Sequence, residues 1–170
     1  MKYDVVIIGG GAAGLFCAIH AGRRGRKVLV IEHNAQIGRK IIISGGGRCN
    51  FTNIHTTPEN FHSKNIHFSR SALARYTPDD FVKLVRKHKI GYYEKKLGQL
   101  FCRESSRQIV EMLLRECRDA KAEIKTGCSV INVSKDLFFS IETSCGKFEA
   151  VKSFVALRGQ SFPKFGANGR

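Results

Sequence analysis

A glycine-rich turn near the N-terminus, residues 9–14, constrains this chain more than any other feature. It follows a β-branched run at Asp4–Ile8, which predicts a buried strand, and it leads into a helical pattern over about Ala12–Arg24. A second apolar run at Val28–Ile31 predicts another strand. Strand, turn, helix and strand in this order form a βαβ unit, which predicts an α/β fold with parallel strands.

The turn contains the pattern GxGxxG at Gly9, Gly11 and Gly14. Gly9 permits the tight turn off the strand, Gly11 lacks a Cβ atom and lets a pyrophosphate approach the backbone, and Gly14 lets the helix pack closely on the strand. The helix directs its free N–H groups and the positive end of its dipole at the phosphates. The alternative is a glycine-rich turn in some other α/β protein, which the complete strand–helix–strand context disfavours.

The turn and one acidic residue predict the first part of a cofactor site. The backbone there comprises Gly9, Gly10, Gly11, Ala12, Ala13 and Gly14. Glu32 ends the second strand, 23 positions after Gly9, where a carboxylate accepts hydrogen bonds from both ribose hydroxyls. A carboxylate also disfavours a ribose 2′-phosphate, so NADP is not expected at this site. NAD and FAD both present ADP, and the turn alone leaves both open.

A second glycine cluster bears on this choice. Residues 38–53, GRKIIISGGGRCNFTN, closely resemble the signature of the BaiN/YhiN-type flavoproteins, in the glutathione-reductase-like group of two-dinucleotide-binding-domain enzymes. The resemblance is nearly continuous over residues 1–53 and looser up to residue 170. It implies the N-terminal portion of a Rossmann-like FAD-binding domain over 1–170, with a parallel sheet, a β-meander inserted at 129–151, and a last parallel strand at 153–157.

The resemblance further implies FAD bound in extended form, with the triple glycine against the cofactor beyond the adenosine. Bare glycine N–H groups suit an anionic or electron-rich ligand, and Arg48 adds a permanent cation. The backbone of Val130 is expected to meet the adenine edge. Beyond the first turn and Glu32, the expected cofactor-binding residues are Arg39, Lys40, Ser44, Gly45, Gly46, Gly47, Arg48, Cys49, Asn50, Val130 and Gly159.

The rest of the chain predicts further regular elements. Residues 33–74 are polar and loop-rich, and Thr77 followed by Pro78 predicts a helix start. A hairpin is expected around residues 95–98 and an amphipathic helix at about Ser106–Ala120. Short strands are expected at about 123–126, 129–133, 138–143, 147–151 and 153–157.

Three functions are compatible with these features. The first is an FAD-dependent oxidoreductase that transfers a hydride through flavin N5 to a small-molecule substrate, with NAD(P)H as a candidate donor and no catalytic residue assigned. The second is a truncated, non-catalytic dinucleotide-binding fragment or subunit that needs a partner chain, because full-length relatives continue with a substrate domain and a C-terminal FAD segment. Leu157 and Arg158 also replace the family's Thr-Gly, with an effect that the sequence leaves open.

The third function is nucleic-acid binding, suggested only by the net charge of +15. It ranks last, because no block of Lys and Arg reaches five or six residues, so nucleic acid is not expected as a partner. Apolar runs are too short for a membrane span and no signal peptide is evident, so a cytoplasmic protein is expected.

The remaining reactive residues do not predict a site. The 6 cysteines are scattered without a CxxC pair, which favours free thiols, and Cys49 is expected to be structural rather than redox-active. His55, His62 and His67 lack the regular spacing of metal ligands, so no metal is expected.

Overall fold

The computed structural model describes residues 2–156, and the chain divides into two compact units. Unit 1 comprises residues 1–41 and 113–170, and unit 2 comprises residues 42–112. The sequence contains no linker at either boundary. The assignment of residues 1–170 to one FAD-binding domain stays a prediction.

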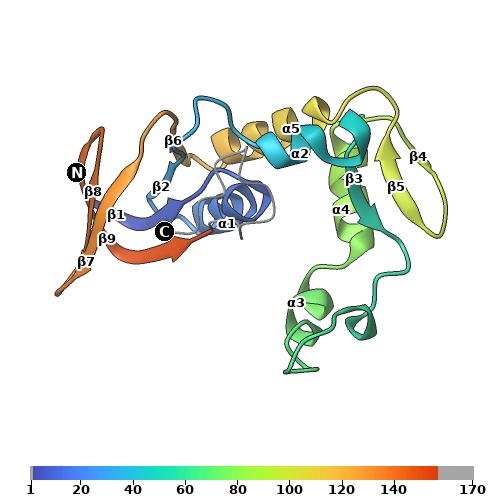
Figure 1. Ribbon diagram of the computed structural model, residues 1–170, viewed down its shortest axis with the longest axis horizontal. Coiled ribbons are helices and arrows are strands. Elements are labelled where there is room, and N and C mark those ends of the chain that lie inside the picture. Colours follow the sequence, from blue (N-terminus) through green and yellow to red (C-terminus); the bar gives the residue numbers. More distant parts are fainter. Residues whose placement is uncertain (1, 157–170) are drawn as a thin grey trace. The chain divides into compact units, whose positions relative to one another are not determined.

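Unit 1 is built on a six-stranded sheet with the order β6-β2-β1-β9-β8-β7 (Figure 1). Its strands are β1 (Lys2–Ile8), β2 (Val28–Ile31), β6 (Glu123–Lys125), β7 (Val130–Lys135), β8 (Phe139–Thr143) and β9 (Gly146–Val155). β1 pairs in parallel with β2 and β9, and β2 pairs in parallel with β6. β7, β8 and β9 form an antiparallel meander. The Rossmann-like α/β fold with its inserted meander is confirmed.

Helix α1 (Ala12–Arg23) joins β1 to β2, as the βαβ pattern predicts. Leu15, Ala18 and Ile19 are buried, which confirms the predicted apolar face. After the helix, Gly25 has φ +72° and its N–H donates to the carbonyl of Gly22 over 2.8 Å. This left-handed position is the helix-ending role expected of a glycine there.

The end of the meander differs from the prediction. The sequence predicts two strands, at 147–151 and 153–157, whereas the structure has the single strand β9. Its first half pairs with β8, its second half pairs with β1, and Glu149 and Ala150 belong to both ladders. No glycine, proline or turn residue separates Val151 from Ser153, so nothing ends the strand there. The predicted break was wrong.

The core of unit 1 lies where the parallel strands meet the meander. Tyr3 and Val6 of β1 pack in one buried cluster with Leu29 and Ile31 of β2. The meander contributes Ile141, Phe148 and Ala150, and Cys128 precedes it. This shared core supports the carboxyl end of β1, where the glycine turn begins, and the neighbouring end of β2.

Unit 2 contains a three-stranded antiparallel sheet with the order β3-β5-β4. Its elements are η1 (Ser44–Gly47), β3 (Asn50–Asn53), η2 (Pro58–Asn60), α3 (Arg70–Arg75), α4 (Pro78–Lys87), β4 (Tyr92–Glu94) and β5 (Gln99–Cys102). The predicted β4–β5 hairpin is confirmed. So is the start of α4, where the side chains and backbone of Thr77 and Asp80 form a capping box.

Two helices cross the boundaries between the units: α2 (Arg39–Ile43) and α5 (Arg107–Asp119), the latter close to its predicted limits. The prediction of a polar, loop-rich stretch over residues 33–74 left out its regular elements, because α2, η1, β3, η2 and most of α3 lie there. β3 escapes a sequence pattern because it is a short polar strand (NFTN) whose partner, β5, is distant in the chain. No helix in the described part of the chain is long and apolar enough to cross a membrane.

Candidate nucleotide-binding site

A pocket of about 240 Å³ in unit 1 lies at the carboxyl ends of β1 and β2. It is lined by predicted cofactor-binding residues, which are Gly10, Gly11, Ala12, Ala13, Glu32, Arg39 and Lys40. It is also lined by residues that were not among the expected cofactor-binding residues, which are Asn34, Gln36, Gly38, Ile41 and Ala156. Residues of the glycine turn, of the segment 32–41 and of position 156 thus line one cavity.

The glycines of the turn have distinct structural roles. A Cβ atom on Gly14 would lie 1.9 Å from the carbonyl oxygen of Gly9, so α1 packs against the turn as closely as the pattern predicts. Gly9 itself has φ +112°, a conformation that favours glycine. A Cβ atom on Gly11, in contrast, would meet nothing within 4 Å. The space beside Gly11 is therefore open to a ligand.

The N-terminus of α1 faces this pocket through Ala12 and Ala13. Gly11 is the N-cap residue and has no side chain with which to satisfy the first N–H groups of the helix. The first turn contains no acidic residue that would oppose a bound anion. The helix end, with Arg39 and Lys40 in the same lining, provides positive charge suited to a phosphate group.

Glu32 is 6% exposed as a residue, and its carboxylate binds the turn directly. Its Oε2 atom accepts a hydrogen bond of 2.8 Å from the N–H of Gly10. Its Oε1 atom accepts bonds from the backbone and side-chain N–H groups of Asn34, at 2.9 and 2.7 Å, and lies 3.1 Å from Nδ1 of His33. A carboxylate has about four acceptor positions, so Oε2 retains one for a ribose hydroxyl.

Asn34 is the residue that sequence reasoning missed most clearly. Besides its two bonds to Glu32, it accepts a hydrogen bond of 2.7 Å from Nη1 of Arg39 through its side-chain oxygen. Its backbone carbonyl accepts from the N–H of Gly127 over 3.0 Å. Asn34 therefore links the acid, a lining cation and the approach to β7. A polar residue three positions after a strand carries no pattern that would have revealed this.

Val130 does not line the pocket. It begins β7, and its half-buried side chain packs against the core of unit 1. The chain approaches Glu32 two residues earlier, where the N–H of Cys128 donates to the Glu32 carbonyl over 3.0 Å. An adenine contact through Val130 stays a prediction. Gly159, Leu157 and Arg158 lie outside the described residues.

The second glycine cluster belongs to unit 2 and begins directly after α2. Gly45, Gly46 and Gly47 have φ values of +56°, +65° and +82°. The cluster is held by hydrogen bonds from Cys49 N–H to the Ser44 carbonyl, at 3.0 Å, and from Ser106 N–H to the Gly47 carbonyl, at 2.8 Å. It is therefore an ordered turn of left-handed glycines.

Three further predicted residues follow the glycines. The Arg48 guanidinium donates to the carbonyl of Arg103, and Asn50 is an exposed residue of β3 that pairs with Phe101. Cys49 is 5% exposed, and burial raises the pKa of its thiol, an effect that a hydrogen bond with Ser44 partly offsets. A protonated, buried thiol is a poor nucleophile, and the structural role expected for Cys49 stays a prediction.

The lining of the unit 1 pocket is chemically suited to the ADP half of a dinucleotide. It offers open space at Gly11, a helix N-terminus, two cations and a carboxylate positioned by the turn itself. These groups match a pyrophosphate and a ribose. Within residues 2–156, no group of three or more His, Cys, Asp and Glu side chains is arranged to hold a metal ion.

Comparisons with known proteins agree with this geometry. The family described as HI0933-like protein Rossmann domain matches residues 3–170. A ribosomal RNA dihydrouridine synthase of Escherichia coli (strain K12) is 46% identical over 98% of this chain and 42% of the relative. A 3-dehydro-bile acid delta(4,6)-reductase of Clostridium scindens is 29% identical over 96% of this chain and 41% of the relative. The chain thus spans about two fifths of the length of these curated relatives.

Among solved structures, a 3-ketosteroid-delta4-(5alpha)-dehydrogenase from Rhodococcus jostii RHA1 matches with a TM-score of 0.65. The match covers 92% of this chain and 46% of the dehydrogenase, at 14% sequence identity. At this identity the likeness concerns the fold alone.

Proposed function

We propose that this chain, which belongs to the HI0933-like protein Rossmann domain family, is the nucleotide-binding part of a flavin-dependent reductase of RNA pyrimidines. Membership of this family supports the broader assignment as an FAD-dependent oxidoreductase. The observation that carries the proposal is the pocket of unit 1, whose lining suits ADP. The choice of substrate rests on the 46% identity of the chain to a ribosomal RNA dihydrouridine synthase. Dihydrouridine differs from uridine by a hydride and a proton added across the C5–C6 double bond. Flavin, when bound, supplies the hydride.

The residues of the chain have proposed roles in holding that cofactor. The N–H groups at the start of α1, near Gly11, bind the pyrophosphate, and Arg39 and Lys40 neutralise its charge. Glu32 accepts from the ribose, while its bond to Gly10 N–H keeps the turn in the binding conformation. The glycines of η1 are proposed to contact the cofactor beyond the adenosine.

RNA is favoured over a small steroid-like substrate for two reasons. Identity is 46% to the RNA-modifying relative and 29% to the bile acid reductase. The net charge of +15 also suits a polyanion, which neither a bile acid nor the cofactor alone would require. The two relatives' names share one chemistry, the reduction of a C–C double bond conjugated to a carbonyl. The proposal places nucleic acid above the small-molecule substrate that the sequence alone favours.

The test compares ribosomal RNA from a strain that carries the gene with RNA from a strain that lacks it. After digestion to nucleosides, mass spectrometry should show that dihydrouridine is lost without the gene and restored by a plasmid copy. Unchanged dihydrouridine in the deletion strain would exclude the RNA substrate.

A reconstituted reaction separates an enzyme from a non-catalytic nucleotide-binding fragment. Purified protein is loaded with FAD and incubated with RNA from the deletion strain, with NADH or NADPH supplied separately as the electron donor. Dihydrouridine that appears only with FAD and one donor supports catalysis. FAD binding without product, from protein that includes the remainder of the family's length, supports the fragment or subunit hypothesis.

A further inference from the structure

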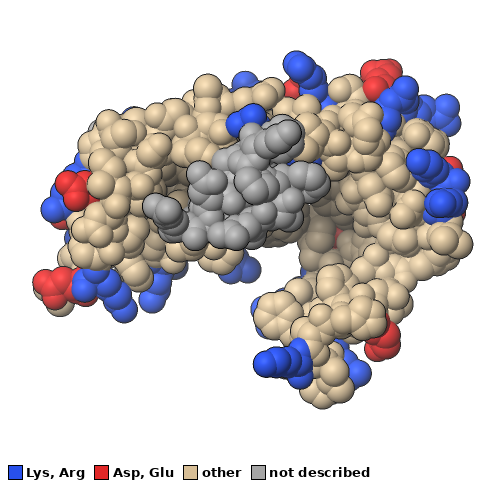
Figure 2. Space-filling view, in the orientation of Figure 1, with Lys and Arg blue, Asp and Glu red and all other residues tan. Residues whose placement is uncertain are grey.

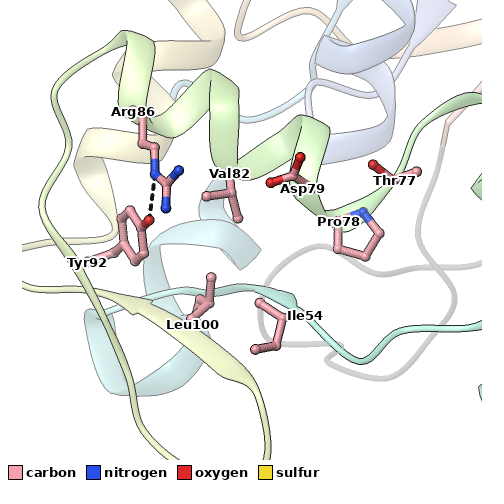
Figure 3. Close-up of a pocket in the computed structure, with 8 residues that line it drawn as sticks. All are labelled: Ile54, Thr77, Pro78, Asp79, Val82, Arg86, Tyr92 and Leu100. Carbon is pink, nitrogen blue, oxygen red and sulfur yellow. Dashed lines mark hydrogen bonds between the residues drawn. The ribbon is translucent and has the colours of Figure 1, made fainter.

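A second pocket, of about 510 Å³, lies wholly within unit 2 and shares no residue with the nucleotide pocket (Figure 3). It is lined by Ile54, Thr77, Pro78, Asp79, Val82, Arg86, Tyr92 and Leu100. Val82 and Leu100 supply buried apolar surface, whereas Arg86 and Asp79 bring exposed charges of opposite sign. The volume lies within the range of small-molecule sites, about 300–1,000 Å³.

Two flat side chains meet at one side of this pocket. The Nε atom of Arg86 donates a hydrogen bond of 2.8 Å to the hydroxyl of Tyr92, and the figure shows the two pointing toward one another. The guanidinium carbon lies 5.8 Å from the centre of the Tyr92 ring. That ring is braced edge-on against Phe51, with centroids 5.8 Å apart. Tyrosine rings and arginine planes are the surfaces on which unpaired RNA bases stack.

Asp79 indicates which part of a nucleotide would enter. A carboxylate repels phosphate, but it accepts hydrogen bonds from the N–H groups on the edge of a base. Lys83 lies 2.9 Å from Asp79 and moderates its charge without removing its acceptor capacity. The pocket therefore suits a base, and phosphates require a different surface.

A basic stretch of unit 2 overlaps the pocket in the sequence and contributes Arg86 to its lining. Between residues 83 and 107 the chain carries an excess of cations over the two acids Glu94 and Glu104. Every one of these cations is exposed; they are Lys83, Arg86, Lys87, Lys89, Lys95, Lys96, Arg103 and Arg107. Figure 2 shows Lys and Arg side chains gathered over β4 and β5. This basic segment, residues 83–107, suits the phosphates of a strand.

We propose that the unit 2 pocket receives one unpaired base of an RNA strand, stacked at Arg86 and Tyr92, while the basic segment binds the flanking phosphates. This inference rests on the proposed RNA substrate. It adds a binding site for a nucleotide that the flavin-binding residues do not supply.

The test measures binding by fluorescence anisotropy at about 100 mM salt, where phosphate contacts still contribute. The first probe is a short fluorescein-labelled single-stranded RNA of mixed sequence, and the second is the same backbone with abasic sites. Tyr92→Leu removes the ring and should weaken binding of the first probe about tenfold, the usual worth of a stacked base. It should leave binding of the abasic probe unchanged.

Two further variants distinguish stacking from charge. Arg86→Lys keeps the charge of an exposed side chain but loses the plane, and should weaken only the base-containing probe. Lys89→Gln removes one cation outside the pocket, and should weaken both probes alike and lower the salt dependence by about one charge. If Tyr92→Leu and Arg86→Lys bind both probes as the unaltered protein does, the pocket does not hold a base.

Failure here is separable from failure of the proposed function. One outcome would overturn the pocket inference alone. In it, dihydrouridine is lost without the gene, but a strain with the Arg86→Lys variant retains dihydrouridine, and the variant binds RNA with unaltered affinity. The proposed function is tested separately, by the dihydrouridine content of ribosomal RNA from the deletion strain, and that measurement does not involve Arg86 or Tyr92.

Discussion

The two glycine clusters use the same residue for different physical reasons. In unit 1, Gly14 is required by contact, because a Cβ atom would lie 1.9 Å from the Gly9 carbonyl oxygen. In unit 2, Gly46 and Gly47 have nothing within 4 Å of an added Cβ atom, but their φ values are +65° and +82°. Packing thus excludes a side chain at Gly14, whereas backbone conformation alone disfavours one at Gly46 and Gly47; Gly45 combines both, because an added Cβ atom would also lie 2.7 Å from the Phe101 ring.

This difference limits what a glycine pattern predicts. The spacing in GxGxxG encodes how closely a helix approaches a strand, and that approach creates the phosphate site, so spacing and function are linked. Consecutive glycines such as Gly45–Gly47 encode only a left-handed turn, which loops of many kinds contain. The second cluster therefore acquires a functional meaning only from the family resemblance.

The largest expected effect is at Gly14. Gly14→Ala inserts a methyl group against backbone that cannot move aside, and overpacking of this kind should lower the free energy of unfolding by about 3 kcal/mol. Chemical denaturation followed by circular dichroism measures it. A variant that unfolds at the unaltered midpoint would show that contact does not require this glycine.

Gly11→Ala should leave the fold intact and weaken the binding of FAD. The new methyl group meets no protein atom within 4 Å, so the unfolding midpoint should not change. It occupies the space proposed for the pyrophosphate, and FAD affinity should fall about tenfold, or about 1.4 kcal/mol, by calorimetric titration.

Gly91→Ala is the matched control for Gly11→Ala. It makes the same substitution in unit 2, where the nearest atom, Cδ of Arg103, is at an ordinary 3.4 Å. FAD should bind this variant as it binds the unaltered protein. Equal FAD affinities for all three proteins would argue against a phosphate at Gly11.

The sequence predicts the first βαβ unit well because its determinants are local. The strand, the glycine spacing, the helix and Glu32 all lie within the first 32 residues, and their positions agree with the structure. The rest of the pocket depends on distant parts of the chain. Ala156 reaches it because its N–H bonds to the Ile8 carbonyl at 2.8 Å, a contact set by the pairing of β9 with β1.

Strand pairing explains the other differences between prediction and structure. β3 is a short polar strand that exists because Asn50 pairs with Phe101, and no local pattern announces it. β9 is continuous because two different neighbours, β8 and β1, pair with its two halves. A local pattern cannot predict where a strand exchanges one partner for another.

A smaller effect is expected at Gly46, where backbone conformation and not packing disfavours a side chain. Gly46→Ala should cost about 1 kcal/mol of unfolding free energy, because a left-handed conformation disfavours a Cβ atom although space is available. Gly46→Asn should recover part of that loss, since asparagine tolerates this region. Chemical denaturation measures the free energy of unfolding of both variants. Equal losses for Gly46→Ala and Gly46→Asn would indicate a steric cause and not a conformational one.

The smallest effect concerns the thiols beside the second cluster, where the fold itself should not change. Burial raises the pKa of Cys49, and burial together with the neighbouring Cys49 raises that of Cys102 to about 11. Since the thiolate is the reactive form, an aromatic disulfide reagent at about pH 8 should label the exposed Cys145 quickly and these two buried residues only after unfolding. Because the pKa of Cys102 is higher in the folded state, its stabilising contribution is complete below about pH 9 and declines as the pH rises toward 11. Peptide mapping after brief labelling identifies the sites, and rapid modification of Cys49 in the folded protein would mean that the turn of the second cluster opens, unlike the tightly packed turn at Gly14.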